Sequence, residues 1–420
     1  MNSRIRTKLL PFAIAALLAG APAAAQNVTS SGATGRIVDA SGQPVAGATV
    51  QIVHEPSGTT KTVTTDADGR YTAQGLRVGG PFDITVSKTG MGQAEKNNVY
   101  LQLGQVSSIN VQMSTSGVQA KDLSAVTVTT SALSQIFSAD NKGLSMNVSQ
   151  RELETTPQGN RSIDDIARLD PRINVTDQGD GSISMAGLPN RFNNISVDGI
   201  SQGDPYGLNA NGLPYQGSPI SVDTIGEYNI STANFDVTSD TVGADINAVT
   251  KSGTNEFHGS VYYAYRNANK MVGNAGWLDN GDRGYDYTGY QRDWTGGVTV
   301  GGPIIKDKLF FFFSAEQEKT TGIGADSSNG LDPSLTGAST SNKISPSDLQ
   351  QVIDTAKALG LQPGSLGGGA VGLTDKRYLG KIDWNISNDH RASFTYQYTK
   401  ENQPIVQGNS SKEVGLDSYW

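Results

Sequence analysis

The sequence contains no cysteine. This absence excludes disulfide bridges, thiol nucleophiles, cysteine-ligated zinc and a lipid-modified cysteine after a cleaved leader. No apolar run of transmembrane-helix length follows the first 25 residues. If the mature chain lies in a membrane, it must do so as a β-barrel, the other fold that satisfies every backbone hydrogen bond in lipid.

Basic residues are also in short supply. The chain has 32 Lys and Arg against 40 Asp and Glu, which gives a formal net charge of −8. An acidic chain is a poor partner for nucleic acid, so none is expected. A length of 420 residues predicts roughly two or three domains.

The N-terminus has the pattern of a secretory signal. Three cations precede an apolar stretch, residues 9–19, that is too short to span a bilayer. Ala23-Ala24-Ala25 supplies the small-x-small cleavage pattern. We therefore predict a signal peptide over residues 1–25 and a mature chain that begins at Gln26. The alternative, an uncleaved anchor, is disfavoured by the short apolar stretch.

Residues 26–115 alternate apolar and polar side chains in short runs separated by turns. This spacing predicts a β-sandwich of antiparallel strands. The runs are Gly35–Asp39, Ala48–Val53, Lys61–Thr65, Tyr71–Ala73, Phe82–Val86 and Ile109–Met113.

Three motifs in this segment resemble the carboxypeptidase regulatory-like domain, a non-catalytic module. They are Gly35-Arg36-Ile37-Val38, the turn and strand from Gly42 to Ala48, and the turn from Thr65 to Tyr71. Asp66 and Asp68 leave calcium binding as an alternative, but the terminal Glu of a calcium loop is missing, so a hairpin turn is favoured. His54-Glu55 lacks the second histidine of a zinc-protease helix. We expect no catalytic residues, no metal and no cofactor.

Residues 116–131 are rich in Ser, Thr and Gly and form a predicted linker. Within it, Val126-Thr127-Val128-Thr129 alternates β-branched residues. An exposed segment of this kind can pair with a partner protein by strand addition. In sequence and position it resembles the TonB box, the energy-coupling segment of TonB-dependent outer-membrane transporters. The alternative is an ordinary edge strand.

Residues 132–252 combine helix caps with short strands and predict a small α+β domain. Ser149-Gln150-Arg151-Glu152 is a capping box, and Asn160 can cap a second helix that Pro171 bounds. Four motifs in order resemble the plug of TonB-dependent receptors: Ile163–Ile173, Met185–Leu188, Val197–Gly199 and Gly243–Lys251. The stretch from Glu227 to Ala233 departs from the usual plug pattern and resembles the Oar-like subgroup, which also carries the sandwich domain.

The loop from Asp204 to Leu213 falls between plug strands. The resemblance implies that such apex loops face the ligand, which makes Asp204, Tyr206, Asn209 and Asn211 candidate contacts. A solvated loop without ligand contact is the equally weighted alternative.

From residue 253 the sequence acquires the two-residue period of a membrane barrel. One face of the five predicted strands is apolar or aromatic, and the other is polar. The predicted strands are Phe257–Arg266, Asp293–Val300, Leu309–Glu316, Tyr378–Ile386 and Ala392–Thr399. The third begins with apolar residues on both faces, so its alternation is the weakest. A soluble sandwich is the alternative.

The connections between these strands alternate in length. Two of the connections are short: Gly302–Asp307 and Asn388–His390. The connection between the first two strands has about two dozen residues. The connection from Thr320 to Asp375 has more than fifty residues, with a helix expected over Pro346–Leu359. Short periplasmic turns and long extracellular loops are typical of outer-membrane barrels. A soluble sandwich gives no reason for the alternation.

The combined prediction is a mainly β protein: a β-sandwich, an α+β plug, and over residues 253–420 the first strands of a transmembrane antiparallel barrel that does not close. The chain is identified as the N-terminal part of an Oar-like TonB-dependent receptor in the outer membrane of a Gram-negative bacterium. The resemblance implies import of an extracellular ligand, energised through TonB and its inner-membrane complex, with outer-membrane lipid around the barrel. An adhesion or secretion component without import remains the alternative.

Overall fold

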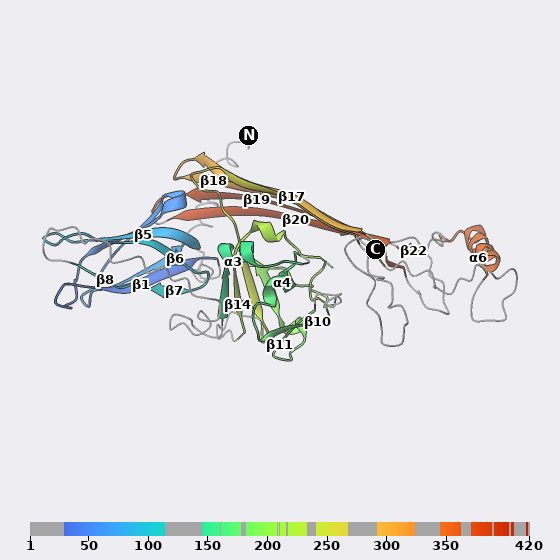
Figure 1. Ribbon diagram of the computed structural model, residues 1–420, viewed down its shortest axis with the longest axis horizontal. Coiled ribbons are helices and arrows are strands. Elements are labelled where there is room, and N and C mark those ends of the chain that lie inside the picture. Colours follow the sequence, from blue (N-terminus) through green and yellow to red (C-terminus); the bar gives the residue numbers. More distant parts are fainter. Residues whose placement is uncertain are drawn as a thin grey trace, which may run out of the picture.

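The computed structural model describes residues 29–113, 145–159, 161–177, 182–207, 209, 211–215, 217–232, 241–267, 292–323, 345–362, 371–388, 390–402, 405–406 and 417–418. The predicted signal peptide and the TonB-box-like residues Val126, Thr127, Val128 and Thr129 lie outside these ranges. Three bodies follow one another along the chain: a sandwich, a plug and a curved antiparallel sheet (Figure 1).

The N-terminal domain is the expected β-sandwich. Its elements are β1 (Ser31–Val38), β2 (Thr49–His54), η2 (Glu55–Ser57), β3 (Thr59–Thr64), β4 (Arg70–Leu76), β5 (Gly79–Ser87), β6 (Ala94–Leu101), β7 (Val106–Ser108) and β8 (Val111–Gln112). One sheet has the order β3-β2-β5-β6 and the other β4-β1-β7, with β8 also on β1. Fully buried Ile37, Ile52 and Ile84 fill the space between the sheets.

Two features of the sandwich differ from the sequence-based expectation. β7 and β8 pair with β1 in parallel, because the chain returns to β1 over the other sheet rather than through a hairpin. β6 was missed because Glu95, Lys96, Asn97 and Asn98 give it a polar centre. It lies at the edge of its sheet, where only its ends, Ala94 and Leu101, are buried.

The turn at Asp66 is built as a hairpin, as favoured from the sequence. Asp66 Oδ1 accepts hydrogen bonds from the backbone N–H groups of Asp68 (2.9 Å) and Arg70 (2.8 Å). Gly69 has φ +72°, and a Cβ there would lie 2.5 Å from the carbonyl oxygen of Ile37. Only glycine fits this turn without strain.

The plug is a small α+β domain. Its elements are β9 (Ser145–Ser149), α3 (Gln150–Thr155), α4 (Ile163–Ala167), β10 (Ile173–Asp177), β11 (Ser182–Met185), η3 (Asn190–Phe192), β12 (Asn194–Val197), β13 (Ile200–Ser201), η4 (Val222–Thr224), β14 (Ile225–Ser231) and β15 (Asp245–Thr250). The main sheet has the order β13-β12-β15-β14-β9, so β9 lies at an edge. Tyr228, Ile230 and Ile166 are fully buried in its core.

The helix caps in the plug were predicted with mixed success. The capping box is confirmed: Ser149 Oγ accepts from the Glu152 backbone N–H, and the Glu152 carboxylate accepts from the Ser149 N–H. The expected cap at Asn160 is wrong, because α4 begins at Ile163 with Ser162 as its N-cap. The Arg161 backbone N–H instead donates to Asp165 Oδ2 (3.0 Å).

The third body is a five-stranded antiparallel sheet in sequence order. Its strands are β16 (His258–Asn267), β17 (Arg292–Ile305), β18 (Leu309–Ile323), β19 (Val371–Asn385) and β20 (Arg391–Asn402). Helix α6 (Pro346–Ala358) lies between β18 and β19, and β21 (Ile405–Val406) pairs with β22 (Asp417–Ser418). All five predicted strands are present, but four are longer than expected. The connection between β18 and β19 therefore starts after residue 323 rather than at 320.

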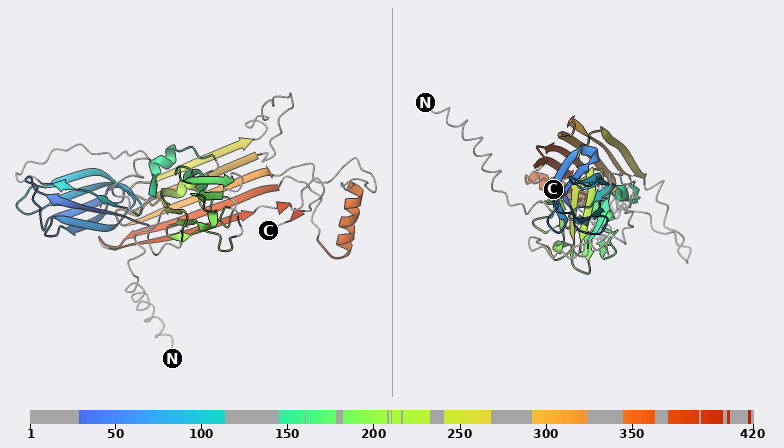
Figure 2. Two further views of the ribbon diagram at one scale, coloured as in Figure 1. Left: turned by 90° about the horizontal axis from the view of Figure 1, so that it is seen from below. Right: turned by 90° about the vertical axis from the view of Figure 1, so that its left-hand side faces the viewer.

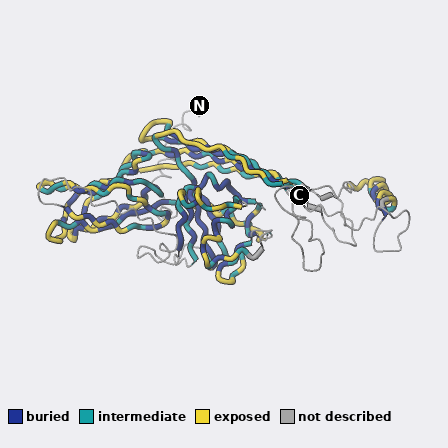
Figure 3. Tube along the Cα trace, in the orientation of Figure 1, coloured by how far each residue is buried: buried dark blue, intermediate teal, exposed yellow. Residues whose placement is uncertain are grey.

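The two faces of this sheet are those that the alternation predicted. Val261, Tyr263 and Phe394 are among the exposed large apolar side chains on one face. Asp293, Ser314 and Lys381 are buried on the other face, against the plug. Figure 3 shows the alternation as yellow and teal along the strands, and a largely dark blue plug beneath them.

The plug lies under the concave face of the sheet, and the sandwich lies at the end where the strands join through short turns (Figures 1 and 2). Helix α6 lies beyond the opposite end of the strands, the end at which β18 finishes and β19 begins (Figure 1). None of the helices in the described ranges has the length and apolarity needed to cross a bilayer.

Candidate functional site at the plug–barrel interface

The predicted apex loop lies at the long-connection end of the sheet. The backbone N–H of Gly217 donates to Glu401 Oε2 (2.9 Å), and Gln397 Nε2 near that end of β20 donates to Gln202 Oε1 (3.0 Å). The resemblance to a plug implies that a loop at this end of the barrel faces the outside and the ligand, and this stays a prediction.

The four predicted contact residues lie in one loop, and most of them make hydrogen bonds within that loop. Asp204 Oδ1 accepts from the N–H of Tyr206 (2.9 Å), and Asp204 Oδ2 accepts from the N–H of Asn209 (3.1 Å). Asn211 is buried, and its amide donates to the Tyr215 carbonyl (2.6 Å). Only Tyr206 projects outward, with 82% of its surface exposed. Three of the residues thus shape the loop that presents the fourth.

A buried ion network joins the sheet to the plug below this loop. Arg377 on β19 lies 2.6 Å from Glu316, 2.6 Å from Glu318 and 2.5 Å from Asp375. Its Nε also donates to the backbone carbonyl of Ser218 in the plug (2.7 Å). One guanidinium therefore gathers three carboxylates of the sheet and clamps a plug segment.

The plug contributes its own cation to this network. Arg161 pairs with Asp223, lies 3.8 Å from Glu316, and has its guanidinium 4.3 Å from the centre of the Tyr262 ring. Ser221 Oγ donates to Glu316 Oε2 (2.9 Å). Such charge-assisted contacts are strong when the groups stay paired, and costly when one partner is removed.

Two of the plug motifs meet at a second polar contact. The Thr250 backbone N–H donates to Asp198 Oδ1 (2.9 Å), and the Thr250 hydroxyl donates to Asp198 Oδ2 (2.6 Å). Lys381 Nζ on β19 donates to the Thr250 hydroxyl (2.9 Å) and lies 3.6 Å from Asp198 Oδ2. The Val-Asp-Gly and Thr-Lys motifs thus supply the Asp198 carboxylate and the Thr250 hydroxyl, which together bind Lys381 of the barrel wall.

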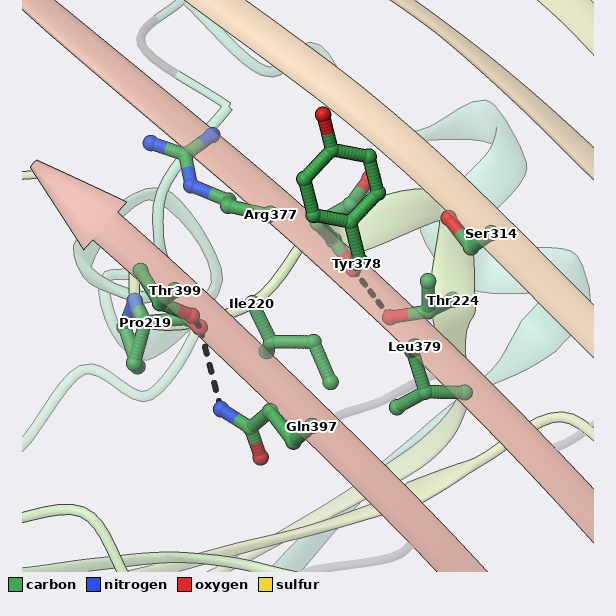
Figure 4. Close-up of a pocket in the computed structure, with 10 residues that line it drawn as sticks. Pro219, Ile220, Thr224, Ser314, Arg377, Tyr378, Leu379, Gln397 and Thr399 are labelled. Carbon is green, nitrogen blue, oxygen red and sulfur yellow. Dashed lines mark hydrogen bonds between the residues drawn. The ribbon is translucent and has the colours of Figure 1, made fainter.

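A narrow cleft separates β19 and β20 from the plug segment around Ile220 (Figure 4). Its cavity volume is about 0 Å³, whereas ligand pockets typically have roughly 300–1,000 Å³. Gln397 and Thr399 close it by donating to the Pro219 carbonyl at 3.0 Å and 2.6 Å. The plug fits the wall tightly here, and the cleft offers no ligand site.

The sandwich is tied to the plug by a buried carboxyl. Glu227 Oε1 accepts from the Leu103 backbone N–H (2.7 Å) and from Asn147 Nδ2 (2.7 Å). Burial raises the pKa of Glu227 to about 7, and the hydrogen bonds from Asn147 and Leu103 partly oppose that rise. Glu227 opens the stretch that departs from the usual plug pattern, so that departure lies at the contact with the sandwich.

A second contact ties the sandwich to the short turns of the sheet. Arg77 packs over the Phe310 ring at 5.6 Å and donates to Asn385 Oδ1 (3.2 Å). Burial lowers the pKa of Arg77, which follows β4, to about 10, and it lowers the pKa of His54, at the end of β2, to about 3. The backbone N–H of Asn255 donates to the Pro56 carbonyl (2.7 Å). The sandwich therefore contacts both other bodies.

Sequence reasoning missed the residues that carry these contacts. Arg377 and Arg161 belong to no motif that was singled out, and Glu227 was noted only as the start of a stretch that departs from the usual plug pattern. The available signal was the inner face of the sheet, where charged side chains alternate with apolar ones on the outside. This signal identified the face but not the partners, because the plug residues that contact Glu316 and Arg377 are 95 and 159 residues away in sequence. Among the described residues, no group of three or more His, Asp and Glu side chains is arranged so that it could hold a metal ion.

Two family models match the chain. The carboxypeptidase regulatory-like domain matches residues 32–114, and the outer membrane beta barrel domain matches residues 249–418. The first covers the sandwich and the second covers the five-stranded sheet. Both domains expected from the sequence are therefore confirmed.

One curated relative matches nearly the whole chain. It is the TonB-dependent transporter Oar of Myxococcus xanthus, 28% identical over 407 residues, which cover 92% of this chain and 34% of the relative. The chain thus spans about a third of the length of that protein. The relative is a transporter, which confirms the expectation of a non-enzymatic chain.

Solved structures of siderophore receptors also align. PirA of Acinetobacter baumannii is 18% identical, with 66% of this chain and 36% of that chain covered and a TM-score of 0.42. The ferric enterobactin receptor PfeA of Pseudomonas aeruginosa is 16% identical, with 65% and 35% covered and a TM-score of 0.41. The family models and the Oar relative confirm that the chain resembles the Oar-like TonB-dependent receptors, and they place it in the outer membrane of a Gram-negative bacterium.

Proposed function

We propose that this protein is an outer-membrane receptor that binds an extracellular ligand and imports it with energy delivered by TonB. The loop that presents Tyr206 would contribute to ligand binding, and Val126, Thr127, Val128 and Thr129 would pair as a strand with TonB. Ligand import and its coupling to TonB are what the resemblance implies, and function belongs to specific sites rather than to a fold.

The polar attachment of the plug to the sheet carries this proposal. Among the described residues, only Phe312 and Leu379 of the sheet join the apolar core of the plug. The other contacts are made through ion pairs and hydrogen bonds such as those of Arg377 and Lys381. Water can replace polar contacts at far lower cost than it can wet an apolar core. Such an interface suits a plug that must move.

The position of β9 gives the pulling force an entry point. β9 is the first plug strand that the structure describes after the TonB-box-like residues, and it lies at the edge of the main sheet. Its five residues pair with β14 from Ser145–Ser231 to Ser149–Glu227. An edge strand can separate from one neighbour while the rest of the sheet stays paired. Tension on the upstream segment would therefore act on β14 and Glu227 first.

Proline at Val128 tests the coupling. Proline removes a backbone donor, so Val128→Pro should disrupt strand pairing with TonB. We expect binding of the purified periplasmic domain of TonB to the whole receptor to fall at least tenfold. Val118→Pro is the matched control, because it places the same change in the same linker outside the box. Equal TonB binding by both variants and the unchanged protein would contradict the proposal.

An adhesion or secretion component on the same scaffold is the second candidate. The sandwich domain favours this second function, because a periplasmic domain that is docked on the plug and the sheet can bind other proteins. It predicts that Val128→Pro leaves surface attachment or secretion unchanged, even where TonB binding is lost. The two functions are thus separated by the same variant.

A further inference from the structure

The charged residues on the outward face of the sheet all have one sign. In the described strands β16–β20, the acidic side chains Asp293, Glu316, Glu318, Asp375, Asp383 and Glu401 all alternate onto the plug side. The outward positions carry only Arg292, Lys319, Lys376 and Lys400, and all four are exposed. This is unexpected in a chain whose formal net charge is −8.

The four cations are neighbours. Lys376 lies directly opposite Lys400. Lys319 pairs with Thr374 and is therefore diagonal to Lys376, and Arg292 is diagonal to Lys319 through the Trp294–Lys319 pair. Directly opposed side chains have Cβ atoms about 5 Å apart, and diagonal ones about 7–8 Å apart. The cations form a continuous line across β17 to β20.

This line lies just beyond the apolar band. Trp294, Tyr378 and Tyr398 each precede or follow a cation by two residues on the same face: Arg292, Lys376 and Lys400 respectively. Two residues of strand span about 6.7 Å. Aromatic residues mark the membrane–water interface, so the cations lie at headgroup depth. They are on the side of the long connections, hence in the outer leaflet.

Within the described part of the chain, no side chain gives these cations a counter-charge. The side chains of Arg292, Lys319, Lys376 and Lys400 make no hydrogen bond or ion pair with any described residue. Lys376 and Lys400 oppose each other directly, an arrangement that repels unless an anion lies between them. Lysine and arginine are the usual ligands of phosphate oxygens.

From this geometry we propose that the outward line of Arg292, Lys319, Lys376 and Lys400 binds the phosphate-bearing headgroup of an outer-leaflet lipid. The apolar band below the line receives the acyl chains, with Tyr378 and Tyr398 at the boundary. The partner is thus an anionic lipid held on the outside of the barrel wall, separate from any ligand that enters through the plug.

Neutralising the opposed pair tests the proposal. The whole protein is placed in phosphatidylcholine nanodiscs doped with diphosphoryl lipid A, and the bound lipid is counted by native mass spectrometry. A cation near a charged headgroup contributes about fivefold in affinity. Lys376→Gln with Lys400→Gln should therefore weaken binding about 25-fold, and Lys376→Arg with Lys400→Arg should retain it.

Lys306→Gln with Lys308→Gln is the matched control. It removes two exposed lysines from the short turn at the other end of the strands, and it should leave lipid binding unchanged. Binding should also fall when the lipid is dephosphorylated or when salt is raised. Equal binding by the Lys376/Lys400 glutamine pair and the unchanged protein would overturn the proposal. An equal loss in the control pair, or undiminished binding of dephosphorylated lipid, would overturn it too.

Discussion

The sandwich and the five-stranded sheet both alternate apolar and polar side chains along their strands. In the sandwich the apolar side chains point into the interior, whereas in the sheet they point outward, away from the plug. In the sandwich, Val50, Ile52 and Ile84 face inward and are fully buried, and the polar residues face water. In the sheet, Val261 and Phe394 face outward, and Asp293 and Lys381 are buried against the plug. Alternation therefore predicts a strand and its two faces, whereas the surrounding medium decides which face points outward.

The third strand of the sheet, β18, has apolar side chains on both of its faces at its start. Phe310 and Phe312 are apolar residues on the plug side, where polar ones are expected. Phe312 is part of the plug core, and Phe310 lies under Arg77 of the sandwich. The weak alternation of this strand therefore marks the place where the wall contacts both other bodies.

A charge in the sandwich core should have the largest effect. Ile84→Asp places an unpaired carboxylate where the side chain is fully buried, and we expect a loss of about 4–5 kcal/mol, enough to unfold the domain. Thr62→Asp, on the exposed face of β3, is the control and should cost less than about 1 kcal/mol. Protease resistance of residues 29–113 measures both. An intact domain in Ile84→Asp would refute the inward arrangement.

Two adjacent phenylalanines sharpen the comparison within one strand. Phe312 is 1% exposed and packs in the plug core, whereas Phe313 is 43% exposed on the outward face. Phe312→Ala should destabilise the docked plug by about 3–4 kcal/mol through the cavity it leaves. Phe313→Ala should cost much less, because lipid fills the space. Hydrogen exchange in β14 and β15 reports the difference, and equal exchange in both variants would show that the faces are misassigned.

The Glu227 contact should depend on pH. Its folded pKa is raised from 4.5 to about 7, so the docked state holds a proton that the separated state releases. Stability from this group is complete below about pH 4.5 and is lost as the pH rises toward 7, by about 3 kcal/mol in all. Denaturant unfolding between pH 4.5 and 8 measures this loss.

Glu227→Gln should remove that pH dependence, because a neutral amide still accepts from Leu103 and Asn147. Glu95→Gln, on the exposed edge of the sandwich, should change nothing. A pH dependence that persists in Glu227→Gln would assign the titration to another group.

The sequence motifs located the domains better than they located the contacts. The capping box at Ser149, the turn at Asp66 and the five alternating strands follow from local rules, because each depends on neighbours within a few residues. The role of Asp198 could not be predicted, since its partners Thr250 and Lys381 come from a distant plug strand and from the barrel wall. The edge strand β6 was missed because the rule for half-buried strands fails where neither face is covered.

The sequence by itself determined the three bodies, the strand positions and the polar and apolar faces, because these depend on periodicities and turn residues that act locally. Only the tertiary structure decided that Arg377 gathers Glu316, Glu318 and Asp375, that Glu227 receives the sandwich, and that four outward cations form one line. The reason is physical. Burial and charge pairing are properties of what is brought together in space, and the register between strands, which is set by the whole sheet, fixes those neighbours.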